Sequence, residues 1–164
     1  MKNRDWLTID EARKRLAYNP ETGALTWKAC RDSTKIGKEA KSLDVCGYVQ
    51  VNIAGTVVKG HRLAWYIHNG QWPDGHIDHI NGVRNDNRIE NLRVVTNAIN
   101  CQNKRKALPS SKTGFLGVVK VYRRYHANIH FNRKKRYIGS FGTPEEAHAA
   151  YVIAKRLLHE GCTL

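Results

Sequence analysis

Hydrophobic positions along the first half of the chain recur with helical and strand periods. Apolar residues in IDEARKRLAY (9–18) have roughly helical spacing, which predicts a helix opened by a Thr8–Glu11 capping box. ALTWK predicts a short strand. GYVQVNIAGTVVKG (47–60) alternates on both sides of Ala54-Gly55 and predicts a hairpin. HRLAWYIHNG then predicts an amphipathic helix that ends at its glycine.

The centre of the chain has short apolar runs around a polar loop. HIDHI (76–80) and LRVVT (92–96) predict two strands, and the asparagine-rich segment between them predicts a turn-rich loop. Thr96 or Asn97 can cap a helix through AINCQNKRK (98–106). The predicted order is therefore strand, loop, strand, helix.

The last third predicts a small sheet and one helix. FLGVVKVY, YHANIHF and KRYIGSF predict three strands, with turns at 123–124 and 132–134. Thr143 and Glu146 form a second capping box. The helix that follows places an apolar face toward the sheet: Ala147, Ala150, Tyr151, Ala154, Leu157 and Leu158. We expect this helix to cover one sheet face and to leave the other free.

These elements predict an α+β protein in two parts. We expect a first domain over residues 1–104, a linker over 105–113 and a second domain over 114–164. The charge also points to a binding partner, because the chain contains 28 Lys and Arg but only 14 Asp and Glu. The stretch from Asn91 to Pro144 contains twelve Lys or Arg and no acid. Such a basic stretch indicates that the protein binds a polyanion, and nucleic acid is the first candidate. The alternative is a basic surface that binds no partner.

Composition excludes several other classes. No run of about 18 apolar residues occurs, so we expect no membrane span, and MKNRDWLTIDEARKRL lacks an apolar signal core. The four cysteines are scattered without a Cys-x-x-Cys pair, so we expect no structural zinc. Reduced thiols in a cytoplasm are the favoured interpretation, with disulfides the alternative.

The central segment contains the groups that phosphodiester hydrolysis needs. Asp78 offers a carboxylate to a hard cation, and His79 offers a base that is mostly neutral at pH 7. A hairpin would return Asn91 to His79, and the next helix would bring Asn100 to the same place. Adjacent strand residues point to opposite faces, so the strand must bend or end near Asp78 and His79.

The segment DHINGVRNDNRIENLRVVTNAIN closely resembles the HNH nucleases, especially the homing endonucleases of phages and mobile introns. YNPETGALTWK, GYVQVNI and HRLAWYIHNGQWP resemble the N-terminal part of that group. The resemblance spans about residues 8–104 and implies the ββα-metal fold. It implies that Asp78 and Asn100 bind Mg²⁺, with Mn²⁺ as a substitute. It also implies that His79 activates water and that Asn91 orients the imidazole by hydrogen bonding.

Other polar residues of the region have structural interpretations. His61 begins a helix and is expected to cap or pack rather than to act in catalysis, and His76 could touch phosphate. Asn97 and Asn103 are alternative helix ligands, although Asn97 can also be a cap. Asn87 is expected to shape the loop.

The C-terminal segment resembles the APETALA/ethylene-response-factor DNA-binding domain in its GV, ANI, YIGSF and TPEEAHAAY motifs. The resemblance implies that the open sheet face enters the major groove. The arginine positions of that family hold Val119 and Val121 here, so its sequence preference does not carry over. The matching reading positions are Asn128, His130, Lys135 and Tyr137. Expected phosphate contacts are Arg123, Arg124, Arg133, Lys134 and Arg136, joined by Lys104 and Arg105 of the basic stretch.

Together these features predict a magnesium-dependent endonuclease that acts on double-stranded DNA without a small-molecule cofactor. The alternative is a DNA-binding regulator with a degenerate nuclease fold. A host-restricting or packaging nuclease would use the same chemistry. We expect a monomer in a bacterial or phage-infected cytoplasm. The sequence leaves open a dimer, the target site and the choice between nicking and double-strand cleavage.

Overall fold

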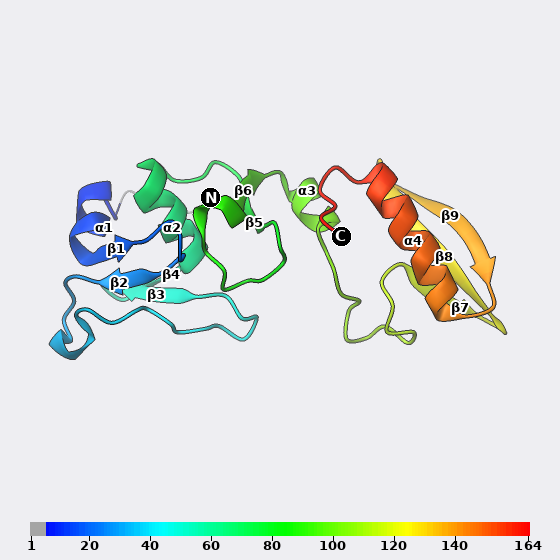
Figure 1. Cartoon of the computed structure of the whole chain (residues 1–164), viewed down its shortest axis with the longest axis horizontal. Helices are drawn as coiled ribbons and strands as arrows, with labels where there is room; N and C mark the ends of the chain where they lie inside the picture. Colours follow the sequence, from blue (N-terminus) through cyan, green and yellow to red (C-terminus); the bar gives the residue numbers. More distant parts are fainter. Residues whose placement is uncertain (1–5) are drawn as a thin grey trace. The chain divides into compact units, whose positions relative to one another are not determined.

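The computed structural model describes residues 6–164 and divides the chain into two compact units, Met1–Thr96 and Asn97–Leu164 (Figure 1). Each unit combines short helices with small antiparallel sheets. The predicted α+β class is confirmed.

Over residues 6–96, the N-terminal unit is built from three two-stranded sheets and two α-helices. Its elements are α1 (Ile9–Arg15), β1 (Leu16–Tyr18), β2 (Leu25–Trp27), a 3₁₀ turn η1 (Ser33–Lys35), β3 (Gln50–Ile53), β4 (Thr56–Lys59), α2 (Gly60–Asn69), β5 (His76–His79), η2 (Ile89–Asn91) and β6 (Leu92–Val95). The sheets pair β1 with β2, β3 with β4 and β5 with β6, all antiparallel. The hairpins predicted at 47–60 and 76–96 are both present.

The first helix is shorter than its sequence pattern predicts. Thr8 caps it by accepting a hydrogen bond from the Glu11 N–H, but the helix ends at Arg15. Leu16 is already a strand residue, paired with Trp27 and almost fully buried. Pairing with β2 therefore outweighs the helical spacing that predicts a helix through residue 18.

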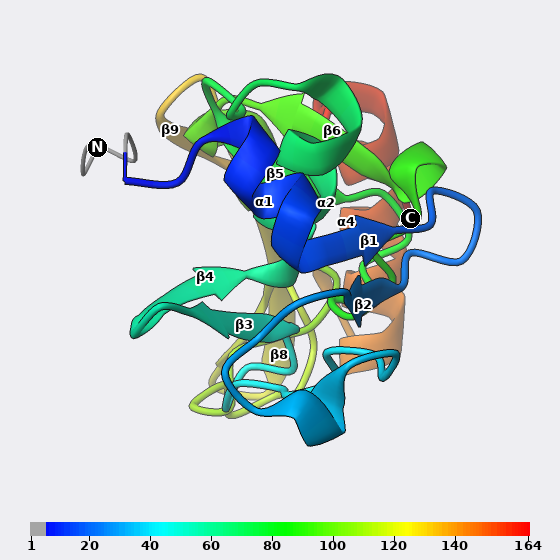
Figure 2. The same ribbon diagram turned by 90° about the vertical axis from the view of Figure 1, so that its left-hand side faces the viewer.

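One apolar core joins the elements of this unit. Its members are Leu7, Ala12, Leu16, Leu25, Ala40, Val51, Ile53, Val58, Leu63, Tyr66 and Ile67. The helices α1 and α2 pack together over it (Figure 2). A second small cluster fixes the β5–β6 hairpin to α2 through Ala64, Ile77 and Leu92. The hairpin is therefore held by burial on the face of α2.

The C-terminal unit contains α3 (Asn97–Gln102), β7 (Val118–Val121), β8 (Arg124–Phe131), β9 (Lys134–Phe141) and α4 (Pro144–Leu158). The three strands form one antiparallel sheet in chain order, and α4 packs against it. Val118, Ala127, Ile129, Ala147 and Tyr151 form its buried core. The predicted Thr143–Glu146 capping box is confirmed, with both of its hydrogen bonds present.

The helix predicted through residue 106 ends instead at Gln102. The chain beyond it is held by the C-terminal segment of the same unit. Gly161 donates its N–H to Gln102 Oε1 at 3.0 Å, and Arg105 Nη2 donates to the Thr163 carbonyl at 2.7 Å. These tertiary contacts replace the helical hydrogen bonds that the sequence pattern predicted.

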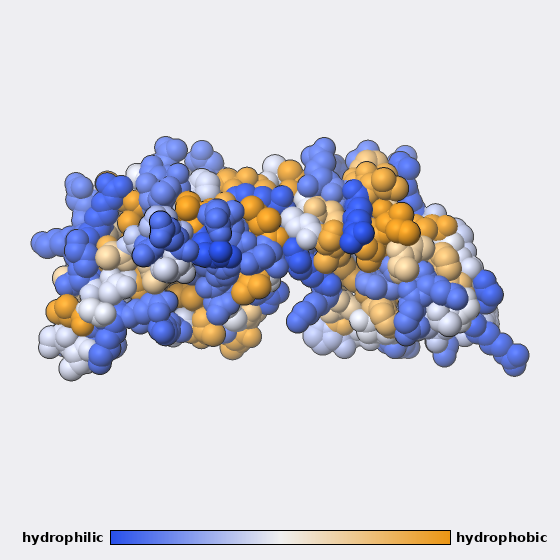
Figure 3. All heavy atoms as spheres, viewed as in Figure 1, coloured by the Kyte–Doolittle hydropathy of each residue, from blue (hydrophilic) through white to orange (hydrophobic). Residues whose placement is uncertain are grey.

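Two further expectations for this unit need correction. The first sheet turn lies at Tyr122 and Arg123, so Arg124 opens β8 rather than standing in the turn. Leu157, expected in the core face of α4, is 80% exposed. Lys155 is buried in that helix face instead, and its Nζ donates to the Lys104 carbonyl. The hydrophobic surface in Figure 3 accordingly includes apolar atoms over α4, where Ile153 and Leu157 are exposed.

Two bulk features complete the description. Within residues 6–164, no helix has the length and apolar character needed to cross a bilayer. Cys30, Cys46, Cys101 and Cys162 are all free thiols.

Candidate functional site

The β5–β6 hairpin brings the central polar residues to the end of a strand. Asp78 pairs with Arg93 across the hairpin, and His79 pairs with Leu92. β5 ends at His79, and the chain turns through Gly82, whose φ of 73° suits glycine. The strand end that the sequence required beside Asp78 and His79 is present.

Asp78 is buried and bound by an arginine from the facing strand. Its Oδ2 accepts hydrogen bonds from Arg93 Nε at 2.9 Å and Arg93 Nη2 at 2.7 Å. The carboxylate is 6% exposed, so this charge-assisted pair compensates for much of the lost hydration. Arg93 thus fixes the side chain of the first expected metal ligand.

His79 is held on the other side by residues from three separate segments. Its Nε2 lies 3.2 Å from Asn87 Oδ1 in the loop. The His61 ring of α2 packs edge-on, with centroids 5.2 Å apart, and the Tyr48 ring lies 5.8 Å away. Burial lowers the pKa of His79 below its usual value, and the positive charge of Arg84 acts in the same direction. The imidazole is therefore neutral at pH 7, the form that accepts a proton.

Asn91 is buried beside β5, and its side chain forms hydrogen bonds with the loop. Its Oδ1 accepts the Asn81 N–H at 2.9 Å, and its Nδ2 donates to the Asp86 carbonyl at 2.8 Å. The His79 ring contacts Asn87 of the same loop. The orienting role that the resemblance implied for Asn91 stays a prediction.

Charged side chains brace the same loop. Asp86 accepts hydrogen bonds from Arg88 Nε and Nη2, at 2.9 Å and 2.8 Å, and from Asn81 Nδ2 at 2.7 Å. The hydrogen bonds from Arg88 lower the pKa of Asp86 to about 2. The loop therefore keeps an ionised carboxylate at its centre over the whole neutral range.

The second expected metal ligand, Asn100, lies on α3 in the C-terminal unit. Its pairing with Asp78 stays a prediction. The donors themselves, a carboxylate and an amide oxygen, are the hard ligands that fit Mg²⁺. Among residues 6–164, no group of three or more His, Cys, Asp and Glu side chains gathers as a metal site.

The other polar residues considered for this site lie in different environments. His61 is buried on α2, and its Nδ1 has no hydrogen-bond partner among the described residues. Burial lowers the pKa of His61 to about 3. His76 is exposed at the start of β5, and Asn97 is exposed on the first turn of α3. Asn103 is buried, where its Oδ1 accepts from the Thr163 hydroxyl.

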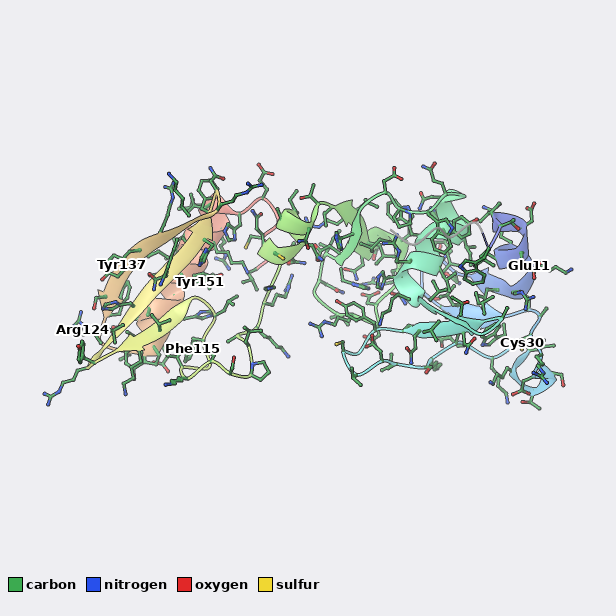
Figure 4. All side chains as sticks on the ribbon, turned by 180° about the vertical axis from the view of Figure 1, so that it is seen from behind. Glu11, Cys30, Phe115, Arg124, Tyr137 and Tyr151 are labelled. Carbon is green, nitrogen blue, oxygen red and sulfur yellow. The ribbon has the colours of Figure 1, made fainter. Side chains whose placement is uncertain are left out.

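The residues expected to contact DNA lie mostly on the open side of the C-terminal sheet and its turns. Arg123, Arg124, His130, Arg133, Lys134, Lys135, Arg136 and Tyr137 are exposed, and Asn128 is half-buried. Figure 4 shows Arg124 and Tyr137 at the sheet and Tyr151 between the sheet and α4. The pairs Asn128–Tyr137 and His130–Lys135 face one another across β8 and β9. The sheet thus collects most of the expected DNA contacts in one unit.

Three of these cations have partners within the protein. Arg124 Nη2 donates to the Ser140 carbonyl at 2.8 Å, and the Arg136 guanidinium lies 5.1 Å from the Phe131 ring centroid. Arg105 is half-buried against Thr163. These contacts orient the side chains and leave the exposed lysines of β9 as the simplest candidates for phosphate contacts.

Sequence reasoning did not select Tyr48 or Arg84, and it gave Asn87 only a role in the loop. Asn87 and Arg84 lie within the polar loop that follows His79, and this position in the sequence is the signal that could have identified them. Tyr48 precedes the β3–β4 hairpin, and nothing in its local pattern points to His79. Only the packing of the 44–48 turn brings it there.

Comparison with known proteins gives one finding. Residues 58–102 match the HNH endonuclease family model. The matched segment runs from β4 through α2 and the hairpin to the end of α3, and it includes Asp78, His79, Asn91 and Asn100. No curated protein and no solved structure matches the chain. The match supports a nuclease of the HNH type.

Proposed function

We propose that the protein is a metal-dependent DNA endonuclease of the HNH type, which uses its C-terminal sheet to hold DNA. The observation that carries this proposal is a buried His79 beside a buried carboxylate, Asp78, inside the segment that matches the HNH family. A phage or mobile-element homing role follows from the sequence resemblance and belongs to the same proposal.

In the proposed reaction, His79 removes a proton from the water that attacks a DNA phosphodiester. The contact of Nε2 with Asn87 Oδ1, at 3.2 Å, holds the imidazole in one orientation. His61 and Tyr48 pack against the imidazole ring and restrict its rotation. Asn91 keeps the loop closed around it.

Asp78 and Asn100 are the proposed oxygen ligands for Mg²⁺, with Mn²⁺ as a substitute. When bound, such an ion stabilises negative charge on the phosphate and on the leaving oxygen. Arg93 holds Asp78 in one orientation.

The exposed cations of the C-terminal sheet are proposed to bind double-stranded DNA. Lys134, Lys135 and Arg133 add positive charge at the β8–β9 turn, and Asn128 and His130 can hydrogen-bond to base edges. The protein is proposed to work as a monomer in a cytoplasm.

A supercoiled-plasmid assay tests this function. The wild-type protein should convert supercoiled DNA to nicked or linear forms with Mg²⁺ and should stop when the ion is chelated. Asp78→Ala should lose the metal-dependent activity. A wild-type protein that binds DNA but cuts none with either Mg²⁺ or Mn²⁺ would instead be the non-catalytic regulator.

A further inference from the structure

A tyrosine from outside the family-matched segment connects His79 to an exposed arginine. The Tyr48 ring lies 5.8 Å from the His79 ring and 5.3 Å from the His61 ring. The guanidinium carbon of Arg84 lies 5.2 Å from the centroid of the same Tyr48 ring. Arg84 therefore stands at the edge of the ring cluster that surrounds the proposed base.

Arg84 is held in this position by the backbone. Its Nη1 donates to the Cys46 carbonyl at 2.8 Å. Asp44 closes the turn that presents this carbonyl, because its Oδ1 accepts the N–H groups of Cys46 and Tyr48 at 2.8 Å and 2.9 Å. Arg84 itself is carried by the braced loop described above. A side chain fixed in advance loses less conformational entropy when it binds a ligand.

The free groups of Arg84 suit a phosphate. The residue is exposed, and the bond to Cys46 uses one of the five N–H donors of its guanidinium. No carboxylate forms an ion pair with Arg84 in the described part of the chain. Lys59 adds a second cation, 5.6 Å from the Tyr48 centroid, although it is paired with Asp44. Guanidinium groups bind phosphate oxygens with two parallel hydrogen bonds.

We propose that Arg84, supported by Tyr48, binds a backbone phosphate of the DNA strand on which His79 acts. Arg84 is then a substrate-binding residue, and Tyr48 is a positioning residue that supports both Arg84 and His79. This inference rests on the proposed nuclease function. It also means that the 44–48 turn, outside the family match, completes the substrate surface.

The test compares DNA affinity and its salt dependence in full-length variants, measured in chelator so that no cleavage occurs. Arg84→Ala should raise Kd roughly tenfold, the loss of one hydrogen-bonded charge contact. It should also lower the slope of log K against log salt by about 0.9. Arg84→Lys should restore the slope but only part of the affinity. Tyr48→Phe should behave as wild type, because the ring remains, whereas Tyr48→Ala should weaken binding as Arg84→Ala does.

Arg31→Ala is the matched control, because Arg31 is an exposed arginine of the same unit, next to Cys30 in the chain (Figure 4). If Arg84→Ala and Arg31→Ala give the same Kd and slope, the proposal is wrong. It is also wrong if Arg84→Ala slows single-turnover cleavage at saturating DNA while Kd and slope stay unchanged. Thermal unfolding of each variant verifies folding. If the wild-type protein binds DNA without cutting it, the nuclease function is refuted. The comparison of Kd values still tests whether Arg84 contacts DNA.

Discussion

In the β5–β6 hairpin the candidate catalytic and metal-binding side chains are buried and held by neighbours, whereas on the β7–β9 sheet most of the candidate DNA-binding side chains are exposed. Asp78, His79 and Asn91 are each at most 6% exposed, and each has a hydrogen bond to another residue. Lys134 and Lys135 are exposed, at the start of β9. Burial tunes the pKa and orientation of a few groups, as proton transfer requires, while exposed charges suit a long polyanion.

This difference predicts that mutations in the two regions separate catalysis from binding. Effects at the buried residues of the hairpin should appear in the rate of cleavage, and effects at the exposed residues of the sheet should appear in affinity. Three variants can break or sharpen the contrast, and the largest effect is expected at His79.

His79→Ala should reduce the single-turnover cleavage rate about 10²- to 10⁴-fold, because a positioned general base contributes that much. The Kd for DNA should stay within about twofold of wild type. The rate is measured at saturating DNA with Mg²⁺, and His68→Ala removes an exposed histidine of α2 as the control. Equal losses of rate and affinity would mean that His79 is structural.

The double variant Lys134→Ala/Lys135→Ala should weaken DNA binding and lower the salt slope by about 1.8, since each phosphate contact contributes about 0.9. The cleavage rate at saturating DNA should change little. Lys14→Ala/Lys38→Ala removes the same charge from exposed positions of the N-terminal unit. If this control lowers the slope equally, general charge rather than the sheet governs binding.

Acid should loosen the hairpin loop through Asp86. Hydrogen bonds from Arg88 lower its pKa from 3.8 to about 2 in the folded protein. The carboxylate therefore stabilises the fold above about pH 4, and this contribution is lost as the pH falls through about 2. The gap in unfolding temperature between wild type and Asp86→Asn should shrink over that range. For Asp74→Asn, which changes an exposed carboxylate, the difference in unfolding temperature from wild type should not shrink as the pH falls.

The sequence predicted elements best where local chemistry was strong. The Ala54-Gly55 turn has φ values of 51° and 85°, the positive pair that a two-residue hairpin needs. Gly70 ends α2 with a φ of 77°, and Thr143 opens α4 with a full capping box. Prediction failed where tertiary contacts overrode the pattern. Leu16 has the spacing of a helical residue but pairs with Trp27 of β2.

By itself the sequence determined the order of elements, the basic character of the second half and the Asp78–His79 pair at a strand end. Turn residues, caps and charges act over a few neighbouring positions, so they can be read locally. Only the tertiary structure decided which residues surround His79. Asn87, His61 and Tyr48 come from three different segments, and the Asn91 side chain forms a hydrogen bond with Asn81 of the loop. Those contacts depend on packing between distant parts of the chain, which no local spacing encodes.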